Sequence, residues 1–181
     1  GTDKHQGVAA VLVADGPLDD HAALDLLRDL TDPLILVLDG VEDPRNYGAC
    51  LRTADAAGAD LVVVGRSRGV AMTPVVSKVA SGAAETQTVA RVANIARFLK
   101  ALRDFDIWIV GADERGGTGL FEANLTGPLA LVLGAEGKGL RRLTREHCDT
   151  LVSLPMRGAV ESLNLSVAAG VCLYEALRQR M

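Results

Sequence analysis

Five short apolar runs, each followed by glycine, proline or an aspartate-glycine pair, constrain the fold of this 181-residue chain more than any other feature. The runs are continuously apolar, which is typical of parallel strands buried on both faces of a sheet. The expected strands are Leu34–Leu38, Leu61–Val64, Ile107–Val110, Leu129–Leu133 and Leu151–Leu154. Their carboxyl ends are expected at Asp39-Gly40, Gly65, Gly111, Gly134 and Pro155.

Segments with helical spacing alternate with these runs. The expected helices are His21–Leu30, Asn46–Gly58, Thr73–Val79, Ala93–Leu102, Leu140–Glu146 and Leu163–Gln179, and an edge strand is expected at Val8–Val13. This alternation predicts an α/β fold, in which a parallel sheet carries helices on both faces. Such sheets bind ligands beyond the carboxyl ends of their strands, where glycines let a ligand approach the backbone.

Composition limits the classes of function. The length suits one domain with a substantial core. Aromatic residues make up 3% of the chain and the formal charge is −4, so neither aromatic stacking surfaces nor bulk charge indicates a nucleic-acid binder. Any positively charged surface for binding nucleic acid must therefore be confined to one part of the chain. We expect no membrane span and no signal peptide, because no apolar run has the required length.

The cysteines and histidines do not form a metal site or a nucleophilic centre. Cys50, Cys148 and Cys172 lie far apart, form no CxxC pair and have no clustered histidines nearby. We interpret them as reduced structural residues, as expected in the cytoplasm. The three histidines, His5, His21 and His147, are expected at the surface. Without a nucleophile, a metal cluster or an acid pair, group transfer by positioning is favoured over hydrolysis.

The first motif is LDGVEDPRNYGACLRTADAAGAD at residues 38–60. Asp43-Pro44 predicts a turn, Asn46 a helix cap, and Gly48 close packing of the helix. Arg52 follows Asn46 by six residues and can project towards the same end of the sheet. Its neighbours are small and apolar, so we expect a buried helix in which Arg52 needs a partner; a solvated helix arginine is the alternative.

The second motif is LVLGAEGKGL at residues 131–140, where three glycines follow a strand. Its spacing matches neither GxxxxGK[ST] nor a GxGxxG opening the first strand-helix unit, so P-loop and Rossmann sites are not predicted. Glu136 would repel phosphate and suits a cationic or hydroxyl-bearing ligand, such as a sulfonium compound or a ribose. The alternative is a plain tight turn.

The third motif is LPMRGAVESLNLSVAAGVCLYE at residues 154–175. It places Ser162 and Asn164 between a strand end and a helix start, where free backbone N–H groups can bind a ligand. In the alternative interpretation, Asn164 or Ser166 only caps the helix.

Together, the three motifs resemble the SpoU/TrmH family of the SPOUT superfamily of RNA methyltransferases. The matching pieces are DPRNYGACLRTADAAG, LVLGAEGKGL and LPMRGAVESLNLSVAAGVCLYEALRQR, and the likeness extends from about Leu34 to the C-terminus. KVASGAAE and RRLTREHCD are similar to the branch that methylates a guanosine 2′-hydroxyl in bacterial 23S rRNA.

This resemblance implies an α/β SPOUT fold with a C-terminal deep trefoil knot, a homodimer with the active site at its interface, and S-adenosylmethionine as cofactor. It implies that residues 31–181 form the catalytic domain and that residues 1–30 form a linker and the N-terminal part of that domain. The family's rRNA enzymes carry a preceding RNA-binding domain, which we expect to be absent from this chain. Apolar residues of the last helix, Val167, Val171 and Tyr174, would fit either an interface or the core.

The resemblance also assigns roles to individual residues. The functional polar positions of the family match Asn46, Arg52, Glu136, Ser162 and Asn164. Cofactor contacts are implied for Gly134, Leu154, Met156, Ser162 and Leu163. An RNA-binding face is expected at Arg45, Lys138, Arg141, Arg142, Arg145 and Arg157, with Arg52 beside it. No metal is implied.

Three other functions compete with methylation of 23S rRNA. A tRNA guanosine 2′-O-methyltransferase of the same family is the first. The second is a non-enzymatic RNA-binding module, which the intact polar set argues against. A nucleotide-binding dehydrogenase is the third, and its glycine spacing is wrong.

Overall fold

A computed structural model describes residues 16–67 and 70–181. Within these ranges the chain forms one seven-stranded parallel sheet with the order β3-β2-β1-β6-β4-β7-β5. The strands are β1 (Leu34–Asp39), β2 (Leu61–Gly65), β3 (Val89–Val92), β4 (Trp108–Ala112), β5 (Thr118–Gly119), β6 (Leu129–Gly134) and β7 (Thr150–Ser153). The expected strand at Val8–Val13 lies outside the described residues.

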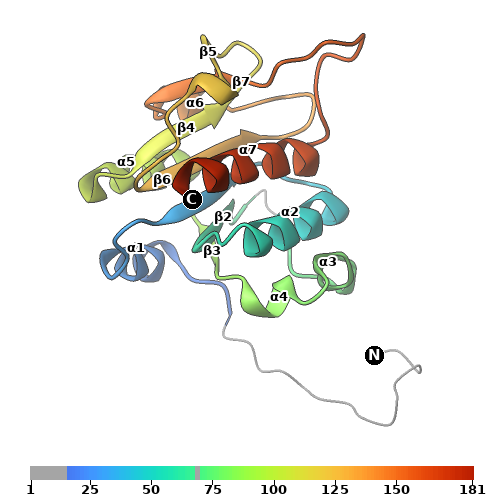
Figure 1. The fold of residues 1–181 in the computed structure, drawn as a ribbon. Helices are drawn as coiled ribbons and strands as arrows, with labels where there is room; N and C mark the ends of the chain where they lie inside the picture. The colour runs from blue at the N-terminus through green and yellow to red at the C-terminus, as the bar shows by residue number, and fades with distance from the viewer. Residues whose placement is uncertain (1–15, 68–69) are drawn as a thin grey trace.

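Helices cover both faces of the sheet, as predicted (Figure 1). The helices are α1 (Asp20–Arg28), α2 (Pro44–Ala56), α3 (Pro74–Ala80), α4 (Ala83–Thr86), α5 (Ile95–Leu102), α6 (Arg142–Glu146) and α7 (Leu165–Arg180), with 3-10 turns η1 (Arg103–Phe105) and η2 (Leu120–Glu122). Two cores result: α2, α3, α4 and α7 pack on one face, and α1 and α5 pack on the other. None of the described helices is long and apolar enough to cross a membrane.

Alternation of side chains across β1 explains the two cores. Leu34, Leu36 and Leu38 point into the core under α2 and α7, whereas Ile35 and Val37 point into the core under α1 and α5. All six residues of β1 are buried, which is why the strand is a continuous apolar run ending in a single aspartate.

The sequence predicted that Gly111 marks a strand end. This prediction is wrong, because Gly111 lies inside β4. A Cβ atom on this residue would lie 2.7 Å from Cys148 Sγ and 2.8 Å from Leu140 Cδ1. Glycine is therefore needed here for side-chain packing. By contrast, Gly65 and Gly134 are the last residues of β2 and β6, as predicted.

The helix expected from Asn46 begins two residues earlier, so the prediction of Asn46 as its cap is wrong. Asp43 is the N-cap, its carboxylate accepts a hydrogen bond from Arg45 N, and Pro44 occupies the first turn. Asn46 therefore sits inside the first turn, where its side chain is free for another contact. Gly48 does allow close packing, since a Cβ there would lie 2.8 Å from Val76 O.

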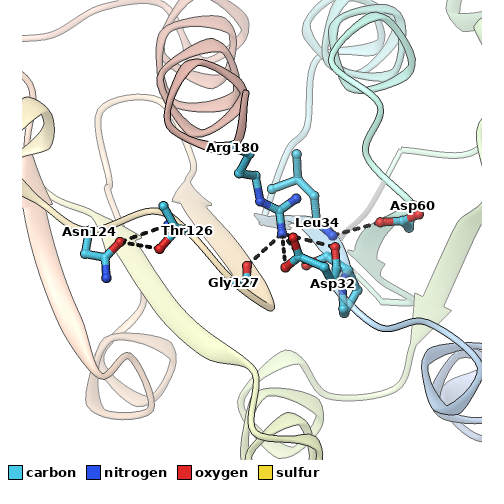
Figure 2. Close-up of polar contacts among 8 residues, drawn as sticks. Asp32, Leu34, Asp60, Asn124, Thr126, Gly127 and Arg180 are labelled. Carbon is cyan, nitrogen blue, oxygen red and sulfur yellow. Dashed lines mark hydrogen bonds and ion pairs between the residues drawn. The ribbon is translucent and has the colours of Figure 1, made fainter.

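At the opposite end of the sheet, Arg180 of α7 joins the loops that lead into β1 and β6 (Figure 2). Its Nη2 donates to Asp32 Oδ1 at 2.8 Å, Asp32 O at 3.1 Å, Pro33 O at 3.3 Å and Gly127 O at 2.7 Å. The side chain is 14% exposed. Nearby, Leu34 N donates to Asp60 Oδ2 at 2.8 Å, and both polar groups of Thr126 donate to Asn124 Oδ1.

We expect Arg180→Ala to lower the free energy of unfolding by about 1–3 kcal/mol, because it leaves the Gly127 carbonyl without this donor, whereas Pro33 O keeps its bond from Leu129 N. Urea denaturation would measure the loss. Arg97→Ala is the control: Arg97 is 71% exposed and pairs with Asp20 at 3.5 Å, so a loss below about 0.5 kcal/mol is expected. Equal losses in the two variants would contradict this role for Arg180.

Candidate active site

A cavity of about 360 Å³ opens beyond the carboxyl ends of β4, β6 and β7. Its volume is in the range of small-molecule sites. Glu136 lines this cavity, and so do all five residues predicted to contact the cofactor. The five are Gly134, Leu154, Met156, Ser162 and Leu163. The structure therefore brings together the second and third sequence motifs at the edge of the sheet where the topology predicts a ligand.

In the loop after β6, the backbone at the end of the loop lies so close to the first residue that this residue cannot carry a side chain. A Cβ atom on Gly134 would lie 2.0 Å from the carbonyl carbon of Gly139 and 2.3 Å from Leu140 N. Gly137 and Gly139 have φ values of +69° and +63°, which glycine adopts without strain. These glycines leave backbone polar groups along the cavity wall, as a ligand held through the main chain requires.

Asn164 both caps α7 and joins the polar cluster, so the two interpretations of this residue are compatible. Its Oδ1 accepts from Ser166 N at 3.0 Å and from Val167 N at 3.4 Å. Its Nδ2 donates to Asn46 Oδ1 at 2.9 Å and to Glu136 Oε1 at 2.6 Å. Leu165 N donates to the same Glu136 oxygen at 3.1 Å.

These contacts connect all three sequence motifs. Asn46 comes from α2, Glu136 from the glycine loop, and Asn164 from the start of α7, 118 residues after Asn46. Since the carboxylate of Glu136 accepts two hydrogen bonds, it is fixed at the cavity wall with the negative charge that a cationic ligand requires.

Arg52 is not brought to this cavity in the same chain. It is exposed on α2, and its Nη1 donates to Ser81 Oγ at 3.2 Å. Arg52 therefore has a partner, as expected, but it is as exposed as the alternative of a solvated arginine requires: Cys50, Leu51 and Ala54 line the buried face of α2, and Arg52 does not. Its described partner is a neutral hydroxyl, which leaves the guanidinium charge uncompensated by a carboxylate.

The residues of the predicted RNA-binding face differ in their partners. Among the described residues, Arg45 and Arg157 are exposed and form no ion pair, whereas four others do. Those pairs are Lys138–Glu42, Arg141–Asp39, Arg142–Glu146 and Arg145–Asp113. Two of the carboxylates, Asp39 and Asp113, are almost fully buried.

The sequence patterns did not single out the buried carboxylates of Asp39 and Asp113 beside the candidate site. Asp39 is the last residue of β1, and Asp113 follows β4 directly. The available signal was their position: each is the first acidic residue after a continuous apolar run. What each carboxylate binds depends on the strand order, which a local pattern does not fix.

The cysteines provide no nucleophile. Burial raises the pKa of Cys50, Cys148 and Cys172 to about 12, so the thiols are protonated at neutral pH. No group of three or more His, Cys, Asp or Glu side chains in the described ranges could hold a metal ion.

A second hollow, of about 550 Å³, lies between α1 and the α5–η1 segment. Within it, Asp25 pairs with His21 at 2.8 Å and with Arg28 at 3.2 Å. None of the predicted site residues lines it. The cavity beside the glycine loop, which the predicted cofactor residues do line, is therefore the candidate active site.

Known proteins match this chain over nearly all of its length. The SpoU rRNA Methylase family matches residues 33–174. Two curated relatives carry the name 23S rRNA (guanosine-2′-O-)-methyltransferase RlmB. The one from Ralstonia nicotianae is 56% identical over 99% of this chain and 72% of its own length, and the one from Haemophilus ducreyi is 52% identical over 98% and 72%.

A solved structure gives the same fold. The SpoU methyltransferase AviRb from Streptomyces viridochromogenes, in complex with the cofactor AdoMet, superposes with a TM-score of 0.78 at 34% identity. The match covers 86% of this chain and 61% of the AviRb chain. Sequence and fold agree, and the chain belongs to the SpoU rRNA methylase family.

Proposed function

We propose that this chain transfers a methyl group from S-adenosylmethionine to the ribose 2′-hydroxyl of a guanosine in 23S rRNA. The observation that carries the proposal is the cavity beside the glycine loop, which has the Asn46–Glu136–Asn164 cluster at its wall. The names of the RlmB relatives support the choice of rRNA and of guanosine. Such a substrate is consistent with the cytoplasmic location expected from the sequence.

The residues of the cavity fit S-adenosylmethionine, which supplies an electrophilic methyl group on a sulfonium centre. Gly134, Leu154 and Leu163 would hold the cofactor through backbone groups, with Met156 and Ser162 beside it. Lys138, Arg145 and Arg115 at the cavity wall each have a carboxylate partner. Glu161 lines the same wall and forms no ion pair within the described residues, so the wall suits a cationic ligand.

Arg52 acts on the RNA rather than as a base. A guanidinium is not deprotonated in proteins, so it cannot accept the proton of the 2′-hydroxyl. Its uncompensated charge suits binding of the adjacent phosphate and stabilisation of the alkoxide that develops during attack. A phosphate oxygen or water then accepts the proton, and Ser162 and Asn164 orient the ribose.

We further propose that the chain is a homodimer and that its C-terminal part forms the trefoil knot of the family. An exposed apolar surface supports the dimer: Leu163, Val167 and Tyr174 are 37%, 51% and 51% exposed, so Val167 and Tyr174 are not core residues. In a dimer, Arg52 of one subunit can serve the cavity of the other. For the knot, the support is the contact of Leu165 N with Glu136 as the chain passes the glycine loop.

The test is transfer of a labelled methyl group from S-adenosylmethionine to unmodified 23S rRNA and, separately, to unmodified tRNA. Digestion to nucleosides should place the label in 2′-O-methylguanosine from 23S rRNA alone. Calorimetry should show cofactor binding in the absence of RNA. Label in tRNA would identify the tRNA branch, and RNA binding without cofactor binding or transfer would favour a non-enzymatic module.

A further inference from the structure

Two buried aspartates flank the glycine loop. In the sheet, β6 lies between β1 and β4, so the loop that leaves β6 passes between the ends of these two strands. Asp39 ends β1 and Asp113 follows β4, and their side chains are 0% and 3% exposed. A buried carboxylate must be compensated, and each is compensated by an arginine at or beyond the end of the loop.

Asp39 joins the two ends of the loop. Its backbone is in register with Gly134, the first residue of the loop. Its Oδ2 accepts a hydrogen bond from Arg141 N at 3.0 Å, immediately after the loop. Its Oδ1 has no hydrogen-bond partner and lies 3.4 Å from Arg141 Nε. One buried side chain therefore spans the opening of the loop and is compensated by Arg141.

Asp113 holds the helix that follows the loop. Its Oδ2 accepts from Arg145 Nε at 3.0 Å and from Arg145 Nη2 at 2.6 Å, and its Oδ1 accepts from Arg115 N at 3.0 Å. Asp113 and Arg145 both line the cavity. A Cβ atom on Gly139 would lie 3.9 Å from Asp113 Oδ2, so this ion pair also borders the loop itself.

We propose that Asp39 and Asp113 are positioning residues for cofactor binding, which act through Arg141 and Arg145 to fix the shape of the loop between Gly134 and Leu140. The inference rests on the proposed function. It gives Arg141 and Arg145 a different role from the RNA contact expected from the sequence. A guanidinium that moved to an RNA phosphate would leave a buried carboxylate unpaired, which is unfavourable.

The first test is Arg145→Gln, with cofactor binding measured by calorimetry and RNA binding measured over a range of salt concentrations. We expect the dissociation constant for S-adenosylmethionine to rise at least about tenfold, because the loop loses its fixed geometry. We expect KM for the cofactor to rise and kcat at saturating cofactor to change little. The slope of log K for RNA against log salt should be unchanged, since no phosphate contact is lost.

Arg142→Gln is the matched control, because Arg142 lies on the same helix and its partner Glu146 is exposed. Its affinity for the cofactor should equal that of the unaltered chain. Asp39→Asn tests the other side of the loop and should also weaken cofactor binding. Arg145→Lys retains the charge but not the two-nitrogen contact, so partial recovery is expected. Thermal denaturation establishes that each variant is folded.

The results separate the two proposals. If the unaltered chain does not bind S-adenosylmethionine, the proposed function fails. If it binds, and Arg145→Gln and Asp39→Asn bind equally well, only the positioning role fails. A smaller salt slope for Arg145→Gln with unchanged cofactor affinity would assign Arg145 to RNA binding and overturn the inference.

Discussion

Arg52→Ala is expected to reduce methyl transfer by at least about 100-fold, because it removes the cation that stabilises the developing alkoxide. The dissociation constant for S-adenosylmethionine should stay unchanged, since the residues proposed to hold the cofactor line the cavity beside the glycine loop and Arg52 is proposed to contact the RNA phosphate instead. Stability should change by less than about 0.5 kcal/mol, because the side chain is exposed and donates only to Ser81 Oγ. Single-turnover methyl transfer and calorimetry measure the two quantities.

Ser81→Ala is the matched control for Arg52. It removes the hydroxyl that the guanidinium contacts but retains the charge, so transfer should fall far less than in Arg52→Ala. Loss of cofactor binding together with transfer in Arg52→Ala would contradict the separation of roles. Arg52→Lys should recover little, because a lysine cannot form the planar two-nitrogen contact with phosphate.

Gly134→Ala is expected to weaken cofactor binding by at least about tenfold, which corresponds to about 1.4 kcal/mol. The new Cβ would lie 2.0 Å and 2.2 Å from the backbone carbonyl atoms of Gly139, so the main chain of the loop must move. A clashing side chain could rotate away. The backbone at the end of this loop cannot, because Asp39 accepts a hydrogen bond from Arg141 N directly after it. We also expect a lower melting temperature, since the movement disturbs the end of β6. Calorimetry and thermal denaturation measure these effects.

Gly158→Ala is the control for this substitution. Gly158 lies in the segment between β7 and α7, and a Cβ added to it would meet nothing within 4 Å. Binding and melting temperature should therefore stay close to those of the unaltered chain. Unchanged cofactor affinity in Gly134→Ala would show that the loop can relax, and it would remove Gly134 from the binding site.

The central strands could be predicted from the sequence because burial on both faces makes them continuous apolar runs. β1, β2 and β6 are of this kind, and their predicted bounds differ from the observed ones by one residue at the carboxyl end. β3 was missed because it lies at the edge of the sheet and carries Arg91, and β5 because it has only two residues. For such strands, tertiary context outweighs the local pattern.

The active site was predicted in a different way. Glycines at strand ends indicated where a ligand binds, but the meeting of Asn46, Glu136 and Asn164 came from family resemblance. The arginine partners could not be predicted at all. From the sequence alone, Arg145 is expected to be a surface cation in α6. Its pairing with Asp113 depends on β4 lying beside β6. Pairings of this kind follow from strand order, so they become visible only in three dimensions.

The position of α7 has a consequence for the timing of folding during synthesis. This helix supplies Asn164 to the active site and Arg180 to the opposite end of the sheet, where it binds Asp32, 148 residues earlier in the chain. Contacts between such distant residues form slowly. A nascent chain that has not yet released α7 from the ribosome lacks both contacts. Completion of the candidate cofactor site therefore requires α7 to be synthesised and docked on the sheet, and a chain at an earlier stage lacks the contact between Asn46 and Asn164.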